Sequence, residues 1–121
     1  MKAVIDSDVL IDYLRGVTQA KREIDRYSDL CYSVVSWMEV MCGAETEDER
    51  MTADALLSSM RMIALSDKIA KKAVEARKKY RFKLPDAVIW ATADLEGCIL
   101  VTRNTKDFDK SDPRIRIPYH I

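Results

Sequence analysis

Short apolar runs alternate with longer stretches of helical spacing along the whole chain, and this alternation constrains the fold most. The runs that we expect to form strands are residues 2–6, 31–35, 62–65, 98–102 and 115–117. Strands that alternate with helices form a parallel sheet with helices on both faces. The sequence therefore predicts an α/β protein with three α/β/α layers and a mostly parallel sheet of four to five strands. Its 121 residues fit a single domain that spans residues 1–121.

Turn and capping residues mark where several helices begin and end. Pro85 suits the first turn of an apolar helix, and Gly97 suits the position just past the end of that helix. Two pairs have the spacing of a capping box, Ser36 with Glu39 and Thr46 with Glu49. A capping box at the first pair would give Glu39 a purely structural role.

Four acidic residues lie near strand ends and helix starts: Asp6, Glu39, Asp86 and Asp107. In open α/β folds such positions converge on the crevice at one edge of the sheet, where ligands bind. Several carboxylates cannot all stay ionised side by side without a cation, and carboxylate oxygens suit divalent metal. The set therefore predicts a site for Mg²⁺ or Mn²⁺ and chemistry on phosphate.

Taken one at a time, these carboxylates also have structural explanations. Asp86 lies in the first turn of a helix, where a carboxylate complements the helix dipole by roughly 0.3–1 kcal/mol. Asp107 follows Asn104 in a segment that could be a solvated turn. Asp6 is harder to explain in this way, because the end of a buried strand is a poor place for an unpaired charge.

Charge is balanced overall but unevenly distributed. The chain has 20 basic and 20 acidic residues, so no net charge draws it onto nucleic acid. Residues 45–49 form an acidic patch, and residues 68–83 contain a dense basic block. The block is either a solvated helix face or a surface that holds a phosphate backbone. Lys79, Arg81 and Lys83 lie closest in sequence to Asp86, and we expect them to make the phosphate contacts.

The cysteines and the single histidine exclude several kinds of chemistry. Cys31, Cys42 and Cys98 form no CxxC pair and follow no signal peptide, which favours buried, reduced thiols in the cytoplasm. No apolar stretch approaches the ~20 residues that span a bilayer, so no membrane association is expected. The only histidine, His120, is the penultimate residue, which weakens every mechanism built on a histidine base.

Two enzyme or signalling families offer alternative roles for Asp6. The segment from Asp6 to Leu10 resembles the nucleophile motif of haloacid-dehalogenase-type phosphatases, but the paired aspartates of that family are missing. A response-regulator receiver fits better, with Asp6 and Asp8 as its acidic pair and Asp67 as its phosphoacceptor. The receiver interpretation leaves Glu39 and Asp86 without roles.

A third family accounts for most of the residues. The chain resembles the PIN-domain nucleases, in particular the VapC toxins of VapBC toxin–antitoxin pairs. Four segments carry the resemblance in the family's order, residues 4–16, 33–39 with Gly43, 84–87 and 102–108. Two residues depart from the pattern. Asp8 stands where many members have a small polar residue, and Trp37 is bulkier than the expected neighbour of the glutamate.

The resemblance implies a metal-dependent endoribonuclease. Asp6, Glu39, Asp86 and Asp107 would be the catalytic residues and would hold Mg²⁺ or Mn²⁺, so that a water attacks an RNA phosphodiester. Thr102 and Asn104 would orient a carboxylate or a water. The resemblance also implies an RNA substrate, a homodimer and a VapB-type antitoxin. The alternative is a non-catalytic binding or signalling module, either a receiver-like phosphoacceptor or an inactive PIN scaffold.

Overall fold

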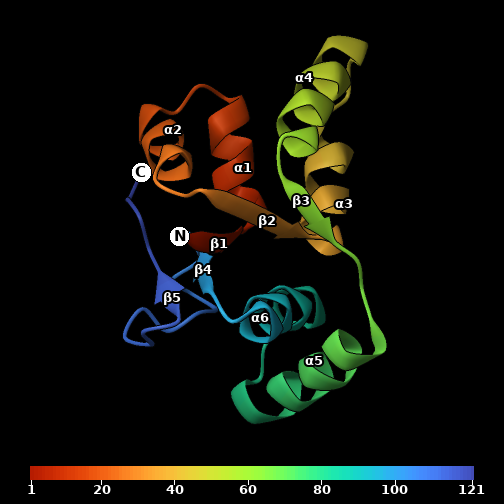
Figure 1. Cartoon of the computed structure of the whole chain (residues 1–121), viewed down its shortest axis with the longest axis vertical. Coiled ribbons are helices and arrows are strands. Elements are labelled where there is room, and N and C mark those ends of the chain that lie inside the picture. Colours follow the sequence, from red (N-terminus) through yellow and green to blue (C-terminus); the bar gives the residue numbers. More distant parts are fainter.

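The computed structural model describes residues 1–121 and contains five strands and six helices (Figure 1). The strands are β1 (Lys2–Ile5), β2 (Asp29–Ser33), β3 (Arg61–Ile63), β4 (Ile99–Val101) and β5 (Ile115–Arg116). The helices are α1 (Ser7–Leu14), α2 (Thr18–Asp25), α3 (Val34–Gly43), α4 (Glu47–Ser58), α5 (Asp67–Tyr80) and α6 (Leu84–Glu96). All five predicted strands are present, with ends that differ from the predicted ones by at most two residues.

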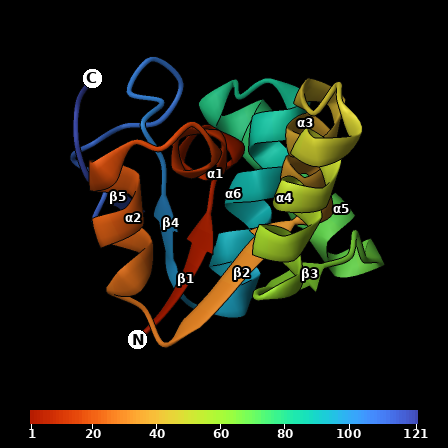
Figure 2. The ribbon, with the colours of Figure 1, turned by 90° about the horizontal axis from the view of Figure 1, so that it is seen from above.

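The strands form one sheet in the order β3-β2-β1-β4-β5, and every pair is parallel. Figure 2 shows β1, β2 and β4 running in the same direction beneath α1. The chain reverses its direction of travel across the sheet between β1 and β4, so the crevice of this sheet lies beyond the carboxyl ends of these two strands. The predicted parallel α/β sheet is confirmed.

This strand order excludes the receiver alternative. In the flavodoxin-like order of receivers, the third strand lies inside the sheet and carries its carboxyl end to the crevice. Here β3 is an edge strand, and Asp67 lies exposed at the start of α5. Asp67 is therefore far from the crevice and begins a helix that Ser66 caps, as its spacing predicted.

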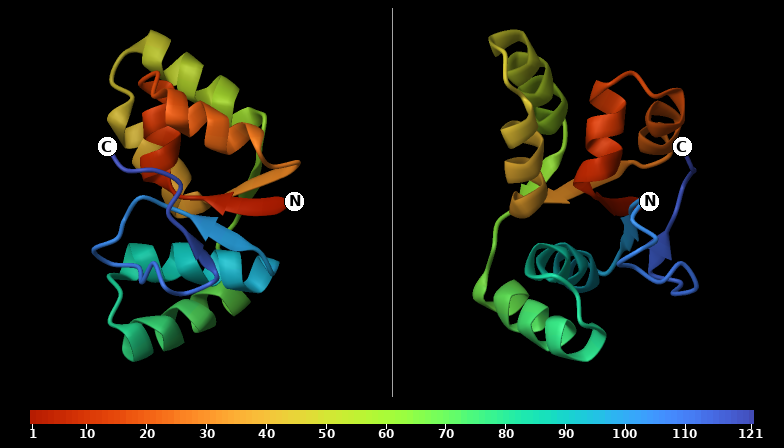
Figure 3. Two further views of the ribbon diagram at one scale, coloured as in Figure 1. Left: turned by 90° about the vertical axis from the view of Figure 1, so that its left-hand side faces the viewer. Right: turned by 180° about the vertical axis from the view of Figure 1, so that it is seen from behind.

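Helices cover both faces of the sheet, so the three predicted layers are present. Helices α1, α2, α3 and α4 lie on one face, and α5 with α6 lies on the other (Figure 3). Successive strand side chains point to opposite faces. Ala3 and Ile5 pack into the core under α1–α4, whereas Val4 and Leu100 pack under α6. Each buried strand therefore contributes apolar residues to both cores.

The second strand ends earlier than the apolar run suggested. Val34 and Val35 belong to α3, because the Ser33 hydroxyl caps that helix by accepting a hydrogen bond from the Val35 amide at 3.1 Å. A local cap thus overrides the β-propensity of two valines. The predicted capping box of Ser36 with Glu39 is wrong, since both residues lie inside the helix. Glu39 is left free for another role.

Other predicted helix signals are confirmed. Thr46 and Glu49 form a complete capping box at the start of α4. Helix α6 has Pro85 in its first turn and ends at Gly97, whose φ of 67° is in the left-handed region. Helix α5 ends on Arg81, which has a φ of 61°. Arg81 occupies a position that normally favours glycine, because a Cβ atom crowds the left-handed conformation.

Two predictions made from composition concern the cysteines and the membrane. Cys31 is buried, and burial raises the pKa of its thiol to about 11, so it is an inert core residue. Cys98 is partly buried, but Cys42 is exposed in the last turn of α3, so the prediction of a buried thiol is wrong there. None of the helices has both the length and the apolar character that crossing a membrane requires.

The left-handed residue at the end of α5 predicts a stability change. Arg81→Gly should raise the free energy of unfolding by about 0.5 kcal/mol, because glycine relieves the crowding of the Cβ atom. Gly97→Ala is the matched control. The added methyl group has no heavy atom within 4 Å, so any loss reports backbone strain, which we expect to cost about 1 kcal/mol. Urea unfolding measures both, and a less stable Arg81→Gly variant would contradict the expectation.

Candidate active site

Asp6 lies at the centre of the crevice between the carboxyl ends of β1 and β4. It is the residue after β1 and the N-cap of α1, and its backbone amide donates to the carbonyl of Val101 at 2.9 Å. Only 5% of Asp6 is exposed, and Thr102 is fully buried beside it. The strand, the helix start and the neighbouring strand therefore all determine where this carboxylate lies.

Both oxygens of the Asp6 carboxylate accept hydrogen bonds. Oδ1 accepts from the Ser7 amide at 2.7 Å, and Oδ2 accepts from the Thr102 hydroxyl at 2.7 Å. The Thr102 oxygen itself accepts from the Asn104 amide at 3.0 Å. Because a hydroxyl has one proton, Thr102 donates to Asp6 and is held there by the loop that follows β4. Thr102 thus orients a carboxylate, the role that the family resemblance implied.

Ser7 connects Asp6 to Glu39 and was not singled out in the sequence. The Ser7 hydroxyl lies 3.1 Å from Oε1 of Glu39 and 3.4 Å from Oδ1 of Asp6, so it links β1 to α3. Glu39 is exposed on α3 and points to this hydroxyl rather than to its own helix end. The position of Ser7 directly after Asp6, in the first turn of a helix, was the only sequence signal for this role.

Asp86 and Asp107 form the other half of the site. Burial, followed by the charges of Asp107 and Glu39, raises the pKa of Asp86 to about 6. The pKa of Asp107 is lowered instead, chiefly because the side-chain amide of Asn104 donates to its carboxylate at 2.9 Å. A proton shared between these two carboxyl groups therefore resides on Asp86. Asn104 orients Asp107, as the resemblance implied.

The pKa of Asp6 is raised most among the four carboxylates. Burial and the neighbouring charges of Asp8 and Glu39 raise it, the hydrogen bonds from Thr102 and Ser7 oppose the rise, and the result is a pKa of about 7. Asp8 accepts from the Arg103 amide at 3.0 Å, but its Oδ1 is buried without a donor. Asp6 and Asp86 both feel the charge of Glu39, so the two halves form one electrostatic unit.

The donor chemistry of this unit suits a hard divalent cation, although its geometry is not a finished ligand cage. No three acidic, histidine or cysteine side chains lie close enough together to hold a metal ion as they stand. The donors are nevertheless carboxylate oxygens, and the raised pKa values of Asp6 and Asp86 and the orphaned buried oxygen on Asp8 are signs of excess negative charge. Mg²⁺ or Mn²⁺ would relieve that charge, with side-chain rotation or ligation through water.

Known proteins resemble this chain in both sequence and fold. The family described as PIN domain matches residues 3–112. The chain belongs to the PIN-domain family. It is 34% identical to Ribonuclease VapC10 of Mycobacterium tuberculosis, over 97% of this chain and 96% of that relative. The predicted resemblance to PIN domains of the VapC type is therefore confirmed.

Solved structures agree with this membership. A toxin–antitoxin complex from Klebsiella pneumoniae contains a chain with a TM-score of 0.92 and 39% identity, covering 98% of this chain and 99% of that one. VapBC2 from Rickettsia felis, bound to a DNA fragment from its promoter, has a TM-score of 0.78 at 18% identity, over 95% of this chain and 96% of that one. The second likeness shows the fold alone.

An ion pair that sequence reasoning missed holds the site loop of this PIN domain against α1. Asp12 is buried and accepts from both Nε and Nη2 of Arg103, and the Tyr119 hydroxyl donates to it at 2.7 Å. The Arg103 amide in turn donates to Asp8. This brace positions the residues after β4 and attaches the C-terminal segment to the same helix. Its members are too far apart in sequence for any local signal.

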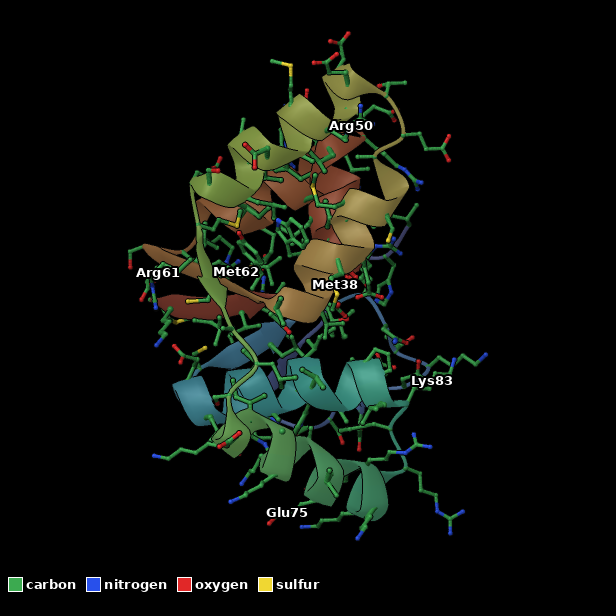
Figure 4. All side chains as sticks on the ribbon, turned by 90° about the vertical axis from the view of Figure 1, so that its right-hand side faces the viewer. Met38, Arg50, Arg61, Met62, Glu75 and Lys83 are labelled. Atoms are coloured by element: carbon green, nitrogen blue, oxygen red, sulfur yellow. The ribbon has the colours of Figure 1, made fainter.

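The three predicted phosphate contacts do not lie together. Lys83 is near enough to the site for its charge to lower the pKa values of both Asp86 and Asp107. Figure 4 shows Lys83 at the end of the molecule opposite Arg61, which marks the amino ends of the strands. Lys79 lies over the Tyr80 ring instead, with Nζ 5.2 Å from the ring centroid. Arg81 lines a separate hollow on α5.

One groove of this PIN domain lies away from the carboxylates. It runs between α1, α3 and α4, has a volume of about 320 Å³ and is half apolar. Ile11, Leu14, Val40 and Ala53 form its apolar part, and Asp48 and Glu49 lie at its rim. The groove does not border any of the four site carboxylates, so it suits a partner rather than the reacting phosphate.

The raised pKa of Asp6 predicts how the stability of the metal-free protein depends on pH. The Asp6 carboxyl titrates near 3.8 when unfolded and near 7 when folded, so between these values only the folded state holds the proton. The free energy of unfolding should therefore fall as the pH rises from about 4 to about 7. Asp6→Asn should reduce this fall to the part that Asp86 contributes, and should stabilise the protein at pH 8 by on the order of 2–4 kcal/mol.

Urea unfolding in EDTA across this pH range measures the effect. Glu49→Gln is a control of opposite sign, because the Thr46 backbone lowers the pKa of Glu49 and so stabilises the folded state above the unfolded pKa. Loss of stability at pH 8 in Asp6→Asn would show that the hydrogen bonds of Asp6 outweigh its burial and crowding.

Proposed function

We propose that this PIN domain is a metal-dependent endoribonuclease that hydrolyses RNA phosphodiesters and acts as the toxin of a toxin–antitoxin pair. One observation carries the proposal. Asp6, Glu39, Asp86 and Asp107 come from four separate segments and meet at the crevice of the sheet, where Asp6 and Asp86 have raised pKa values. Such crowding of carboxylates destabilises a fold, and it is typical of a site that holds a divalent cation.

Asp6 and Asp86, with Glu39 and Asp107, would hold Mg²⁺ or Mn²⁺. The bound ion supplies positive charge that activates water and stabilises the charge developing on the phosphate. The chain's own residues keep the carboxylates in place. Thr102 holds Oδ2 of Asp6 and Asn104 holds Asp107, so neither needs to reorient when substrate binds.

No histidine takes part in this mechanism. His120 is exposed near the end of the chain, and no imidazole is among the groups that shift the pKa values of Asp6, Asp86 and Asp107. Proton transfer by an imidazole base, as in metal-independent ribonucleases, is therefore not part of the proposal. This agrees with the interpretation that the single histidine suggested in the sequence.

The proposal includes an RNA substrate, an antitoxin partner and a homodimer in the cytoplasm. One relative is named a ribonuclease, and solved neighbours are toxin–antitoxin complexes. The groove between α1, α3 and α4 would accept apolar side chains of a VapB-type antitoxin, since Val40 and Leu14 form part of its lining. An antitoxin there leaves the carboxylates on a neighbouring face.

Loss of the central carboxylate should abolish cleavage. We expect Asp6→Ala to reduce Mg²⁺- or Mn²⁺-dependent cleavage of RNA by at least about 100-fold, because the cation loses its most buried ligand. Asp67→Ala should cleave at the wild-type rate, since Asp67 lies far from the crevice. Gel assays on single-stranded RNA measure both. Inactivation by Asp67→Ala with a silent Asp6→Ala would refute the proposed nuclease.

Metal binding separates an active nuclease from an inactive PIN scaffold. Mg²⁺ or Mn²⁺ should raise the melting temperature of the wild type by mass action, equivalent to about 2.7 kcal/mol at 100 times the dissociation constant. The double variant Asp6→Asn with Asp86→Asn should lose this response. Wild-type protein that melts at the same temperature with and without metal, and cleaves nothing, would be the inactive scaffold.

Charge neutralisation tests the phosphate contacts. Replacing Lys79, Arg81 and Lys83 by glutamine should weaken RNA binding for all sequences and flatten its salt dependence by up to roughly one unit per lost contact. The metal response should persist, because none of the three binds the ion. The matched control removes three exposed cations elsewhere, Lys21, Arg22 and Arg50. Equal salt slopes in the two triple variants would show that the basic block is only a solvated helix face.

A further inference from the structure

Tyr80 presents an aromatic ring to solvent near the candidate active site. It is the last residue of α5 and is 40% exposed. Its ring stacks on Phe82, with centroids 5.3 Å apart and planes inclined by 29°, and it also touches Trp90 at 5.5 Å. Phe82 is in turn fixed against the buried Phe108. The ring is therefore held rigidly by the core while part of its surface remains open.

A hollow leads from Tyr80 to the site carboxylates. It has a volume of about 190 Å³, and Tyr80, Phe82, Trp90 and Asp107 are among its lining residues. Asp107 belongs to the proposed metal site, so this hollow opens directly beside the reacting phosphate. An apolar aromatic wall next to that position suits a planar group that is covalently attached to the phosphate.

Cations border Tyr80 on the side away from the site. A second hollow of about 190 Å³ contains Lys72, Lys79 and Arg114 beside the Tyr80 ring. Beyond it, Arg77, Lys78 and Arg81 line a third hollow of about 450 Å³. Lys79 lies over the Tyr80 ring and Arg77 donates to the Phe82 carbonyl at 2.7 Å. Neither these two nor Lys78 and Arg81 form an ion pair with the protein, so no carboxylate neutralises their charges.

Two acidic residues that line the first hollow, Asp109 and Asp112, already have partners within the protein. Asp112 pairs with Arg114 at 2.8 Å, and Asp109 accepts hydrogen bonds from the Ser111 amide and hydroxyl. The charge of Asp112 is therefore balanced by Arg114, whereas Asp109 keeps its charge with its Oδ1 hydrogen-bonded to Ser111. The path from Asp107 past Tyr80 towards Arg81 thus changes from carboxylates to an aromatic wall and then to free cations.

We propose that Tyr80 is a stacking platform for one base of a single-stranded RNA segment that leads away from the cleavage site. Lys79 and Arg81 contact the phosphates on its far side. The inference rests on the proposed ribonuclease function and deepens it. Exposed aromatic rings interleaved with cations are how proteins bind single strands without reading their sequence, whereas paired bases cannot reach such a ring.

A second copy of the chain is the competing occupant, and charge disfavours it. A two-fold symmetric contact would bring the same patch of both copies together. Lys79, Arg77 and Arg81 would then face their own counterparts, with Glu75 as the one acidic side chain in these two cationic hollows. An RNA strand carries a negative phosphate at each nucleotide, and these phosphates complement the cations of the patch.

Binding of labelled single-stranded RNA in EDTA, where cleavage stops, tests the proposal. Tyr80→Ala should weaken binding by about 5- to 150-fold, which corresponds to ~1–3 kcal/mol for one stacked base. Tyr80→Phe and Tyr80→Trp should bind within about twofold of the wild type. The salt dependence should stay the same in all three, because no charge is removed, and binding of the same sequence as a duplex should not change.

Tyr13→Ala is the matched control, since Tyr13 also has a lysine over its ring, with Nζ of Lys21 5.7 Å from the centroid. It lies on α1, away from the hollows, and its variant should bind RNA normally. If Tyr80→Ala melts early, Tyr80→Leu keeps apolar packing without a planar ring and should show the same loss of binding.

The outcomes distinguish this inference from the proposed function. Wild-type protein that neither binds RNA in EDTA nor cleaves it with metal would refute the ribonuclease. Wild-type protein that binds and cleaves, with Tyr80→Ala and Tyr80→Leu binding equally well, would overturn the platform alone. If Tyr80→Ala changed the oligomeric state in sedimentation but left the RNA affinity unchanged, the platform would also be overturned. The patch would then belong to a contact with a second copy of the chain.

Discussion

The buried hydrogen bond from Thr102 to Asp6 is the interaction on which the site depends. Asp6 ends β1, caps α1 and receives a proton donor from the loop after β4, so one carboxylate joins three elements. Without this bond, a carboxylate that is 5% exposed would have only one backbone donor against its burial. The parallel register of β1 and β4 makes it possible, because Ile5 lies opposite Val101 and the next residues of both strands meet.

Electrostatic crowding at this point is opposed by structure elsewhere. Asp6 and Asp86 carry raised pKa values, which means that the metal-free fold is destabilised by their ionisation at neutral pH. The brace of Asp12, Arg103 and Tyr119 holds the same loop from the other side with opposite charges. An electrostatically destabilised site held by rigid surroundings is a common compromise between function and stability.

The two helix layers and the edge of the sheet carry different functional surfaces. The crevice at the carboxyl ends of β1 and β4 holds the carboxylates, and the α1–α4 layer carries the groove that suits a partner. The α5–α6 layer carries the aromatic wall and the free cations that suit RNA. Because Lys83 lies between α5 and α6 and its charge reaches Asp86, the substrate surface and the site adjoin.

Local signals in the sequence were sufficient for most of the fold and for the composition of the site. Strand runs, the caps at Thr46 and Ser66 and the stop at Gly97 act within a few residues, so they can be read from the chain alone. The sequence also determined which carboxylates reach the crevice, since a parallel sheet gathers its strand ends. Only the tertiary structure decided that Glu39 reaches Ser7, that Asp12 pairs with Arg103, and that Tyr80 touches Trp90. Those contacts join residues from different elements, and helix packing and side-chain direction, which have no local signature, set them.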